Sequence, residues 1–225
     1  MIIEYLDKLA GSVIILTMQV TVYGASGRVG RIVVRLLLER GHEVVALVHS
    51  HNPFGEQTGL TVQAGDIYES TDVERALRGS QAVISTLGSW GTKRKDVVGS
   101  AAALIIPGMR AAGTKRIVTV TGIAALWAGD NPRLRDRAAR LMLLLVAPKI
   151  VRDGERHLEL LAASDLDWTT VRSPAMVKGQ SSNYALRNKL SMGLYAIPRE
   201  AVARAIVDQL DSQDFIGSAP VIYKR

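Results

Sequence analysis

The chain has 225 residues, 48% of them apolar, and contains no cysteine. A chain of this length and composition can bury a full hydrophobic core as one domain, which excludes a disordered chain or a disulfide-stapled scaffold. Its net charge of +7 comes from basic residues spread along the sequence, with short clusters at 93–95 and 133–140. We therefore expect a phosphate-bearing small molecule rather than nucleic acid as its partner.

The first 17 residues are predicted to be an extension that precedes the working domain. Glu4, Asp7 and Lys8 interrupt them, and their apolar core is too short for a secretory signal peptide. No stretch of the chain is long enough to span a bilayer. Because Met18 stands directly before the first predicted strand, we expect an N-terminal extension over 1–17 and one domain over 18–225. The lack of cysteine fits a reducing compartment, so we expect a cytoplasmic location.

A glycine-rich turn follows the first predicted strand. Apolar residues alternate over 18–22, the sequence YGASGRVGR occupies 23–31, and an apolar stripe with helical spacing begins at Val29. Gly24 suits a turn with positive φ, Gly27 allows the backbone to approach a pyrophosphate, and Gly30 allows the helix to pack closely. The order of strand, glycine turn and helix therefore predicts a phosphate site at the helix N-terminus.

Strand and helix signals alternate through the rest of the chain, with a continuous apolar run of the buried parallel kind at 43–49. Such alternation predicts right-handed crossovers and a mostly parallel sheet. We therefore predict an α/β fold, a single doubly wound Rossmann-type domain. Its later strands are expected at 60–66, 81–88, 115–122, 166–174 and 219–223, and its later helices at 72–79, 97–108 and 199–210.

The second strand lacks the acidic residue that would hold a ribose 2′-hydroxyl in an NAD site. His49 stands at the strand's end, and Arg28 lies inside the glycine turn. A cation near the turn favours a 2′-phosphate, so we expect NADP(H) as the cofactor, with NAD(H) as the alternative. His49 could equally be an ordinary surface histidine, so Arg28 is the stronger candidate.

Several motifs together resemble the atypical short-chain dehydrogenase/reductases, within which the chain is similar to NmrA-like proteins and to the NADPH-using flavin/biliverdin reductases. These motifs are the glycine turn, GD at 65–66, AVISTLG at 82–88, KRIVTVTG at 115–122 and WTTVRSP at 168–174. The resemblance implies pyrophosphate contacts from Gly24, Ala25, Ser26, Gly27, Arg28 and Val29, and adenosine contacts from His49, Asp66 and Ile67. It also implies ribose and nicotinamide contacts from Leu87, Gly88, Thr121, Ser173 and Pro174.

The chain departs from that family at the catalytic positions. Most short-chain reductases use a Tyr-x-x-x-Lys pair as the proton donor, and no tyrosine here has a lysine four residues later. The serine and histidine of flavin/biliverdin reductase correspond to Gly122 and Ala175. Thr121 remains as the candidate catalytic hydroxyl, although a threonine at a strand end can equally cap a backbone group.

Two further segments could shape a substrate pocket. The loop 88–96 follows the fourth strand, and its Trp90 could stack on a planar acceptor, although an exposed loop is the plainer interpretation. The segment 126–161 joins basic residues to an apolar run, which is typical of a membrane-surface helix, but we favour a lid or dimer face with a buried apolar side. We expect no metal site, since His157 has no partner ligands at metal spacing.

The missing proton donor narrows the reaction. Reduction of a flavin, quinone or similar conjugated ring needs a stacked acceptor, and solvent can supply the proton. We therefore expect an NADPH-dependent reductase of small conjugated acceptors, acting as a monomer or homodimer. The alternative is a non-catalytic NADP(H)-binding protein that senses redox state and regulates a partner, as some NmrA-like proteins do. A sugar-nucleotide epimerase is the third possibility.

Overall fold

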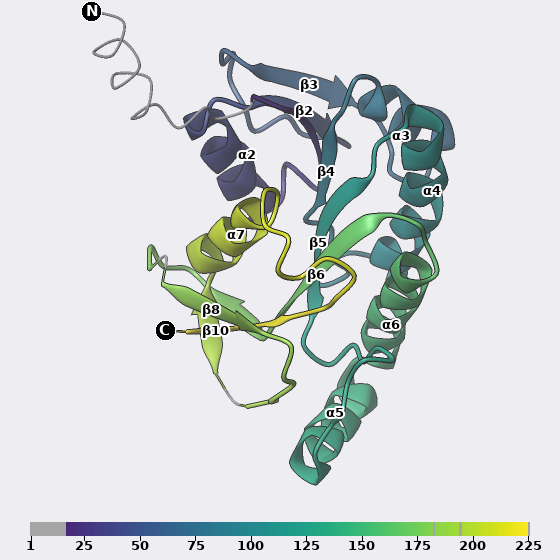
Figure 1. Ribbon diagram of the computed structural model, residues 1–225, viewed down its shortest axis with the longest axis vertical. Helices are drawn as coiled ribbons and strands as arrows, with labels where there is room; N and C mark the ends of the chain where they lie inside the picture. Colours follow the sequence, from purple (N-terminus) through teal and green to yellow (C-terminus); the bar gives the residue numbers. More distant parts are fainter. Residues whose placement is uncertain (1–16, 182, 194, 225) are drawn as a thin grey trace, which may run out of the picture.

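The computed structural model describes residues 17–181, 183–193 and 195–224. The predicted extension over 1–17 therefore lies outside the described residues, apart from Thr17. The labels used below follow Figure 1.

An eight-stranded sheet forms the centre of the domain, in the order β3-β2-β1-β4-β5-β6-β10-β8. Its strands are parallel except for β8, which runs antiparallel to β10. The predicted mostly parallel, doubly wound sheet is confirmed. The strands span β1 Gln19–Tyr23, β2 Glu43–Val48, β3 Leu60–Ala64, β4 Ala82–Ser85, β5 Arg116–Gly122, β6 Asp167–Ser173, β8 Tyr184–Arg187 and β10 Val221–Lys224.

Helices cover both faces of the sheet (Figure 1). On one face α2 packs against α7, and on the other α4 packs against both α3 and α6. These helices span α2 Gly30–Glu39, α3 Ser70–Leu77, α4 Val97–Ala112, α6 Pro148–Ala162 and α7 Arg199–Asp208. The predicted helices agree with these apart from their ends, the largest difference being that α4 continues past Pro107 to Ala112.

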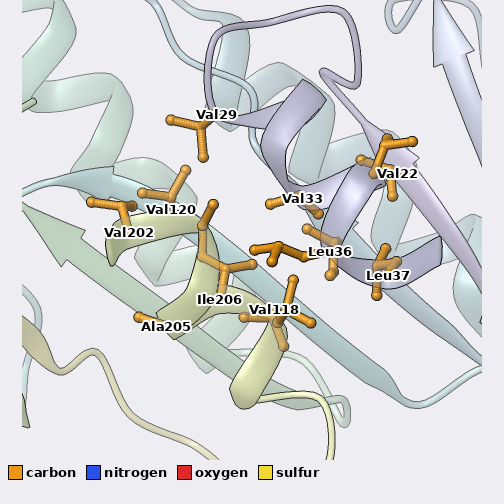
Figure 2. Close-up of a cluster of buried hydrophobic side chains, with 14 of the residues drawn as sticks. Val22, Val29, Val33, Leu36, Leu37, Val118, Val120, Val202, Ala205 and Ile206 are labelled. Atoms are coloured by element: carbon orange, nitrogen blue, oxygen red, sulfur yellow. The ribbon is translucent and has the colours of Figure 1, made fainter. Parts of the chain in front are cut away.

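Side-chain alternation along the strands builds a separate core on each face. Val20 and Val22 of β1 join the cluster under α2 and α7, whereas Tyr23 joins the cluster under α3, α4 and α6. Successive strand residues point to opposite faces, so one strand can feed both cores. Figure 2 shows the first cluster, in which Val33 of α2 and Ile206 of α7 meet over the sheet.

The segment 126–161 buries less of its apolar side within the chain than a lid would. It forms two helices, α5 (Leu134–Val146) and α6, which are divided at Ala147 and Pro148. Proline suits the first turn of a helix but cannot continue the preceding one. The apolar side of α5 is also only partly buried in the chain, because Leu143 and Leu144 pack inward while Leu145 is exposed.

Three short strands were not predicted. Strands β7 (Ala175–Val177) and β9 (Ala196–Pro198) form a small separate parallel pair beyond the end of β6. Strand β8 closes the edge of the main sheet next to β10. These strands of three or four residues depend on a distant partner, so their own sequence gives little signal.

The order of the strands fixes where a ligand can bind. The chain runs outward from β1 to β3 and then returns to the other side of β1 as β4. In open sheets of this kind, ligands bind at the carboxyl edge of the strands where the order reverses. That reversal lies between β1 and β4, and the glycine turn follows β1 there.

Candidate cofactor and acceptor site

The glycine turn between β1 and α2 has no room for side chains at two of its three glycines. Gly24 has a φ of 76°, and a Cβ there would lie 2.9 Å from the amide nitrogen of Leu87. A Cβ on Gly30 would lie 2.1 Å from the carbonyl oxygen of Gly24. The positive φ predicted for Gly24 and the close packing predicted for Gly30 are both confirmed.

Gly27 is the least constrained of the three glycines. Its amide donates to the carbonyl oxygen of Gly24 over 2.9 Å, which closes the turn. A Cβ there would meet only that same oxygen, at 3.0 Å. A side chain on Gly27 would therefore project mainly into the space above the turn, so this position suits a test of what the turn binds.

The beginning of α2 can accept an anion. Among the described residues, the amides of Arg28, Val29 and Gly30 donate to no protein acceptor, and the helix has neither a side-chain cap nor an acidic residue in its first turn. Free N–H groups and the positive end of the helix dipole together favour a phosphate. The turn and the donor set therefore fit the pyrophosphate of a dinucleotide.

Strand β4 supports the turn from its neighbouring position in the sheet. The hydroxyl of Thr86 lies 3.1 Å from the carbonyl oxygen of Gly24 and 3.2 Å from that of Tyr23, and donates to this pair. Leu87 and Gly88 follow directly, and a Cβ on Gly88 would meet open space. The sequence analysis did not identify Thr86, because its role depends on the pairing of β1 with β4.

A carboxylate from the end of the third strand lies next to His49, although the second strand itself ends without an acidic residue, as predicted. Asp66 follows β3, and its carboxylate oxygen lies 3.5 Å from Nε2 of His49. The Asp66 side chain is held in place because it also accepts the amide of Tyr68 over 3.0 Å. A ligand at this corner would therefore meet a histidine and an acid together.

Arg28 does not share a groove with His49. It lines a groove of roughly 480 Å³ between α2 and the segment that follows β7. Arg35 in this groove is paired with Glu39 and Glu200, whereas Arg28 has no ion-pair partner among the described residues. The groove is therefore cationic. Its lining residues are Arg28, Arg31, Ile32, Arg35, Lys178, Gly179 and Arg199.

The loop after β4 is anchored at its base and exposed at its tip. Ser89 is buried and donates to the carboxylate of Asp153 over 2.7 Å, and that carboxylate also accepts the amides of Val98 and Gly99 at the start of α4. The Trp90 side chain, in contrast, is 66% exposed. An anchored loop with an exposed indole can offer a stacking surface to a planar ligand.

The ends of β5 and β6 lie side by side. Thr121 pairs with Arg172 in register, and Gly122 pairs with Ser173. The Oγ1 atom of Thr121 would lie only 2.8 Å from a Cβ on Gly154 of α6. Helix α6 therefore presents its backbone, rather than a functional side chain, to the one hydroxyl that the sequence singles out for catalysis.

Most other hydroxyl groups are engaged elsewhere, but the buried hydroxyl of Tyr68 has no hydrogen-bond partner among the described residues. Ser173 is buried and its hydroxyl donates to the carbonyl oxygen of Pro174 over 3.0 Å. Burial raises the pKa of the Tyr68 phenol, whose ring lies under the Arg94 guanidinium at 3.6 Å. Four further tyrosine hydroxyls are hydrogen-bonded to protein acceptors, those of Tyr23, Tyr184, Tyr195 and Tyr223.

Arg172 is a functional neighbour that the sequence analysis missed. Its guanidinium is fully buried and makes two bonds to the buried Asp130 carboxylate, at 2.6 and 2.7 Å. It also donates to the carbonyl oxygens of Ala125 and Ala219. This network ties the end of β6 to the segment that follows β5.

Comparisons with known proteins agree with this geometry. The chain belongs to the NAD(P)H-binding family, whose profile matches residues 24–213. Its relatives include an uncharacterized protein of Mycobacterium tuberculosis, 28% identical over 182 residues. That match covers 80% of this chain but only 17% of the mycobacterial protein, so the chain spans a small part of that relative.

Solved structures share the fold. A wide-type short-chain dehydrogenase/reductase from Veillonella parvula, in complex with NADP, is 18% identical with a TM-score of 0.74, covering 93% of this chain and 95% of that one. A candidate NADH-flavin reductase from Streptococcus pneumoniae is 21% identical with a TM-score of 0.71, covering 92% and 100%. The chain is thus a member of the NAD(P)H-binding family with a Rossmann-like fold.

Within the described residues, no helix is both long and apolar enough to cross a membrane. No group of three or more histidine, aspartate and glutamate side chains in the described part of the chain is arranged to hold a metal ion.

Proposed function

We propose that this chain is an NADP(H)-dependent reductase of small conjugated acceptors such as flavins or quinones. The observation that carries the proposal is the contrast between the two halves of the site. The dinucleotide half has a complete glycine turn with free amides, whereas in the acceptor half no acid or base of the described residues is hydrogen-bonded to the Thr121 hydroxyl. This contrast favours an acceptor that needs orientation more than it needs a proton donor.

The chemistry follows from that contrast. A bound reduced nicotinamide supplies a hydride, which brings two electrons and one proton to the acceptor. A flavin or quinone then needs one further proton, which water can deliver to an exposed ring. A simple ketone needs that proton as the hydride arrives. Gly154, the residue that lies beside Thr121, has no side chain that could provide it. Trp90 is proposed to stack on the acceptor ring.

The preference for NADP(H) over NAD(H) rests on the local charge. Arg28 carries a planar, permanently charged guanidinium at the turn, which suits a phosphate. His49 is a second proposed contact, but Asp66 beside it offsets part of any positive charge there. We therefore assign the larger share of the discrimination to Arg28. The remaining proposed cofactor contacts are Gly24, Ala25, Ser26, Gly27, Val29, Ile67, Leu87, Gly88, Thr121, Ser173 and Pro174.

A second candidate function is a non-catalytic redox sensor that binds NADP(H) and regulates a partner. The observation that favours it is the same lack of an acid or base near Thr121. A sensor and a reductase differ in one measurable property, because only the reductase consumes NADPH when an acceptor is present.

The test is NADPH oxidation by the full chain against flavins, quinones and aliphatic ketones. We expect turnover with a flavin or quinone and none with the ketones. Gly27→Val should lose activity, and its matched control is Gly55→Val, at a glycine of the loop between β2 and β3 where an added Cβ would meet no atom within 4 Å. Binding of NADPH without turnover of any acceptor would favour the sensor, and efficient ketone reduction would overturn the argument from the missing acid.

A further inference from the structure

Helix α5 stands apart from the rest of the fold. It follows β5, so it leaves the sheet at the carboxyl edge where the candidate site lies, and it forms one end of the molecule beyond α6 (Figure 1). Its inner side is firmly attached. Asp136 is fully buried and accepts the amide of Met192 over 2.8 Å, and Arg140 is paired with Glu155 of α6.

The outer side of α5 is apolar, the reverse of an ordinary surface helix. Large apolar side chains recur along it at helical spacing and point into solvent. Their exposed fractions are 84% for Leu134, 59% for Leu141, 64% for Met142, 72% for Leu145 and 77% for Val146. A contiguous exposed apolar strip on a folded protein marks an interaction surface.

Basic side chains surround this strip, and exposed acidic side chains are absent from it. Residues 131–154 contain six arginines and lysines but only two acids, Asp136 and Asp153, both of which are buried. The exposed cations of this segment are Arg133, Arg135, Arg137, Lys149 and Arg152. The segment around α5 therefore combines exposed apolar side chains with exposed cations and, over residues 131–154, exposes no acidic side chain.

The positive charge of this surface decides which partner the apolar face of α5 binds. A second copy of this chain, docked through the same face, would bring five exposed cations against five others with no exposed acid on this segment to pair with them. An anionic lipid surface satisfies both features, because its acyl region accepts the apolar side chains and its headgroups attract the cations.

We propose that α5 is a membrane-surface anchor that docks the protein on anionic lipid. Leu141, Met142 and Leu145 would lie in the boundary between headgroups and acyl chains, with Arg137 and Lys149 at the lipid phosphates. The helix would lie in the plane of the surface without spanning it. This proposal is independent of the reductase activity, since it concerns a surface outside the dinucleotide site.

The test is co-sedimentation of the full chain with vesicles of equimolar phosphatidylserine and phosphatidylcholine, compared with phosphatidylcholine alone. We expect binding to the anionic vesicles only. The double variant Leu141→Gln/Leu145→Gln should abolish that binding, and circular dichroism should show that its fold is unchanged because both side chains are exposed.

A second pair of variants tests the charge. Arg137→Gln/Lys149→Gln should weaken binding about 30-fold, since each cation near an anionic surface contributes about 1 kcal/mol. The matched control, Arg78→Gln/Lys224→Gln, removes two exposed cations from elsewhere and should bind almost as tightly as the parent. Failure of the parent chain to bind anionic vesicles, or equal effects of the two charge pairs, would overturn the proposal. So would a dimer in sedimentation velocity that the leucine variant dissociates.

Discussion

Loss of the buried Arg172–Asp130 ion pair should destabilise the protein more than any other single charge change in the described residues. Both side chains are fully buried, and the Asp130 carboxylate also accepts the amide of Trp127 over 3.0 Å. In Asp130→Asn the guanidinium would stay buried without a counter-charge. Removing one partner of a buried pair costs about 3–5 kcal/mol, which corresponds to a fall in Tm of roughly 6–20 °C for a chain of this size.

The assay is urea denaturation of Asp130→Asn followed by circular dichroism, which gives the change in the free energy of unfolding. Asp165→Asn is the matched control, since it makes the same substitution in an exposed carboxylate that pairs with Arg110 and Lys115. Exposed pairs contribute little because water screens them, so the control should keep its midpoint. A loss of less than about 1 kcal/mol in the free energy of unfolding of Asp130→Asn would refute the view that this pair holds the end of β6 to the segment after β5.

Three further predictions concern other parts of the chain. Burial lowers the pKa of His157 to about 4. The free energy of unfolding should therefore be unaffected by this histidine above pH 6.5 and should fall by about 3 kcal/mol as the pH drops toward 4. Urea midpoints measured across this pH range should show the fall, and His157→Leu should remove it. NADPH should bind more tightly than NADH in calorimetry, and Arg28→Ala, but not Arg78→Ala, should shrink the difference. A chain that starts at Met18 should fold and bind NADPH like the full chain, and a loss of solubility would assign the first 17 residues to the core.

The main sheet could be predicted because its signals are local. The run at 43–49 is apolar at nearly every position, and Gly24 and Gly30 stand where a strand turns into a helix. The short strands β7, β8 and β9 could not be found in this way, since each owes its conformation to a partner that is distant in sequence. The division of α5 from α6 is marked in the sequence by Pro148, which stands in the first turn of α6.

The candidate site was predictable only in its dinucleotide half. The glycine turn is one continuous segment, so its sequence carries its geometry. Other parts of the site are assembled across the fold: in the acceptor half Thr121 lies beside Gly154 of α6, and at the adenosine end His49 lies beside Asp66, which follows the next strand. Neither pairing leaves a pattern in the chain, because each depends on how the strands and helices are arranged in space.

The central claim is that the glycine turn holds a reduced nicotinamide dinucleotide, and calorimetric titration with NADPH tests it most directly. The parent chain and Gly55→Val should bind NADPH with the same affinity, whereas Gly27→Val should fold normally and show no binding. The added side chain on Gly27 would meet only one protein atom at 3.0 Å and would otherwise fill the space above the turn. Unchanged NADPH affinity in a correctly folded Gly27→Val variant would contradict the account.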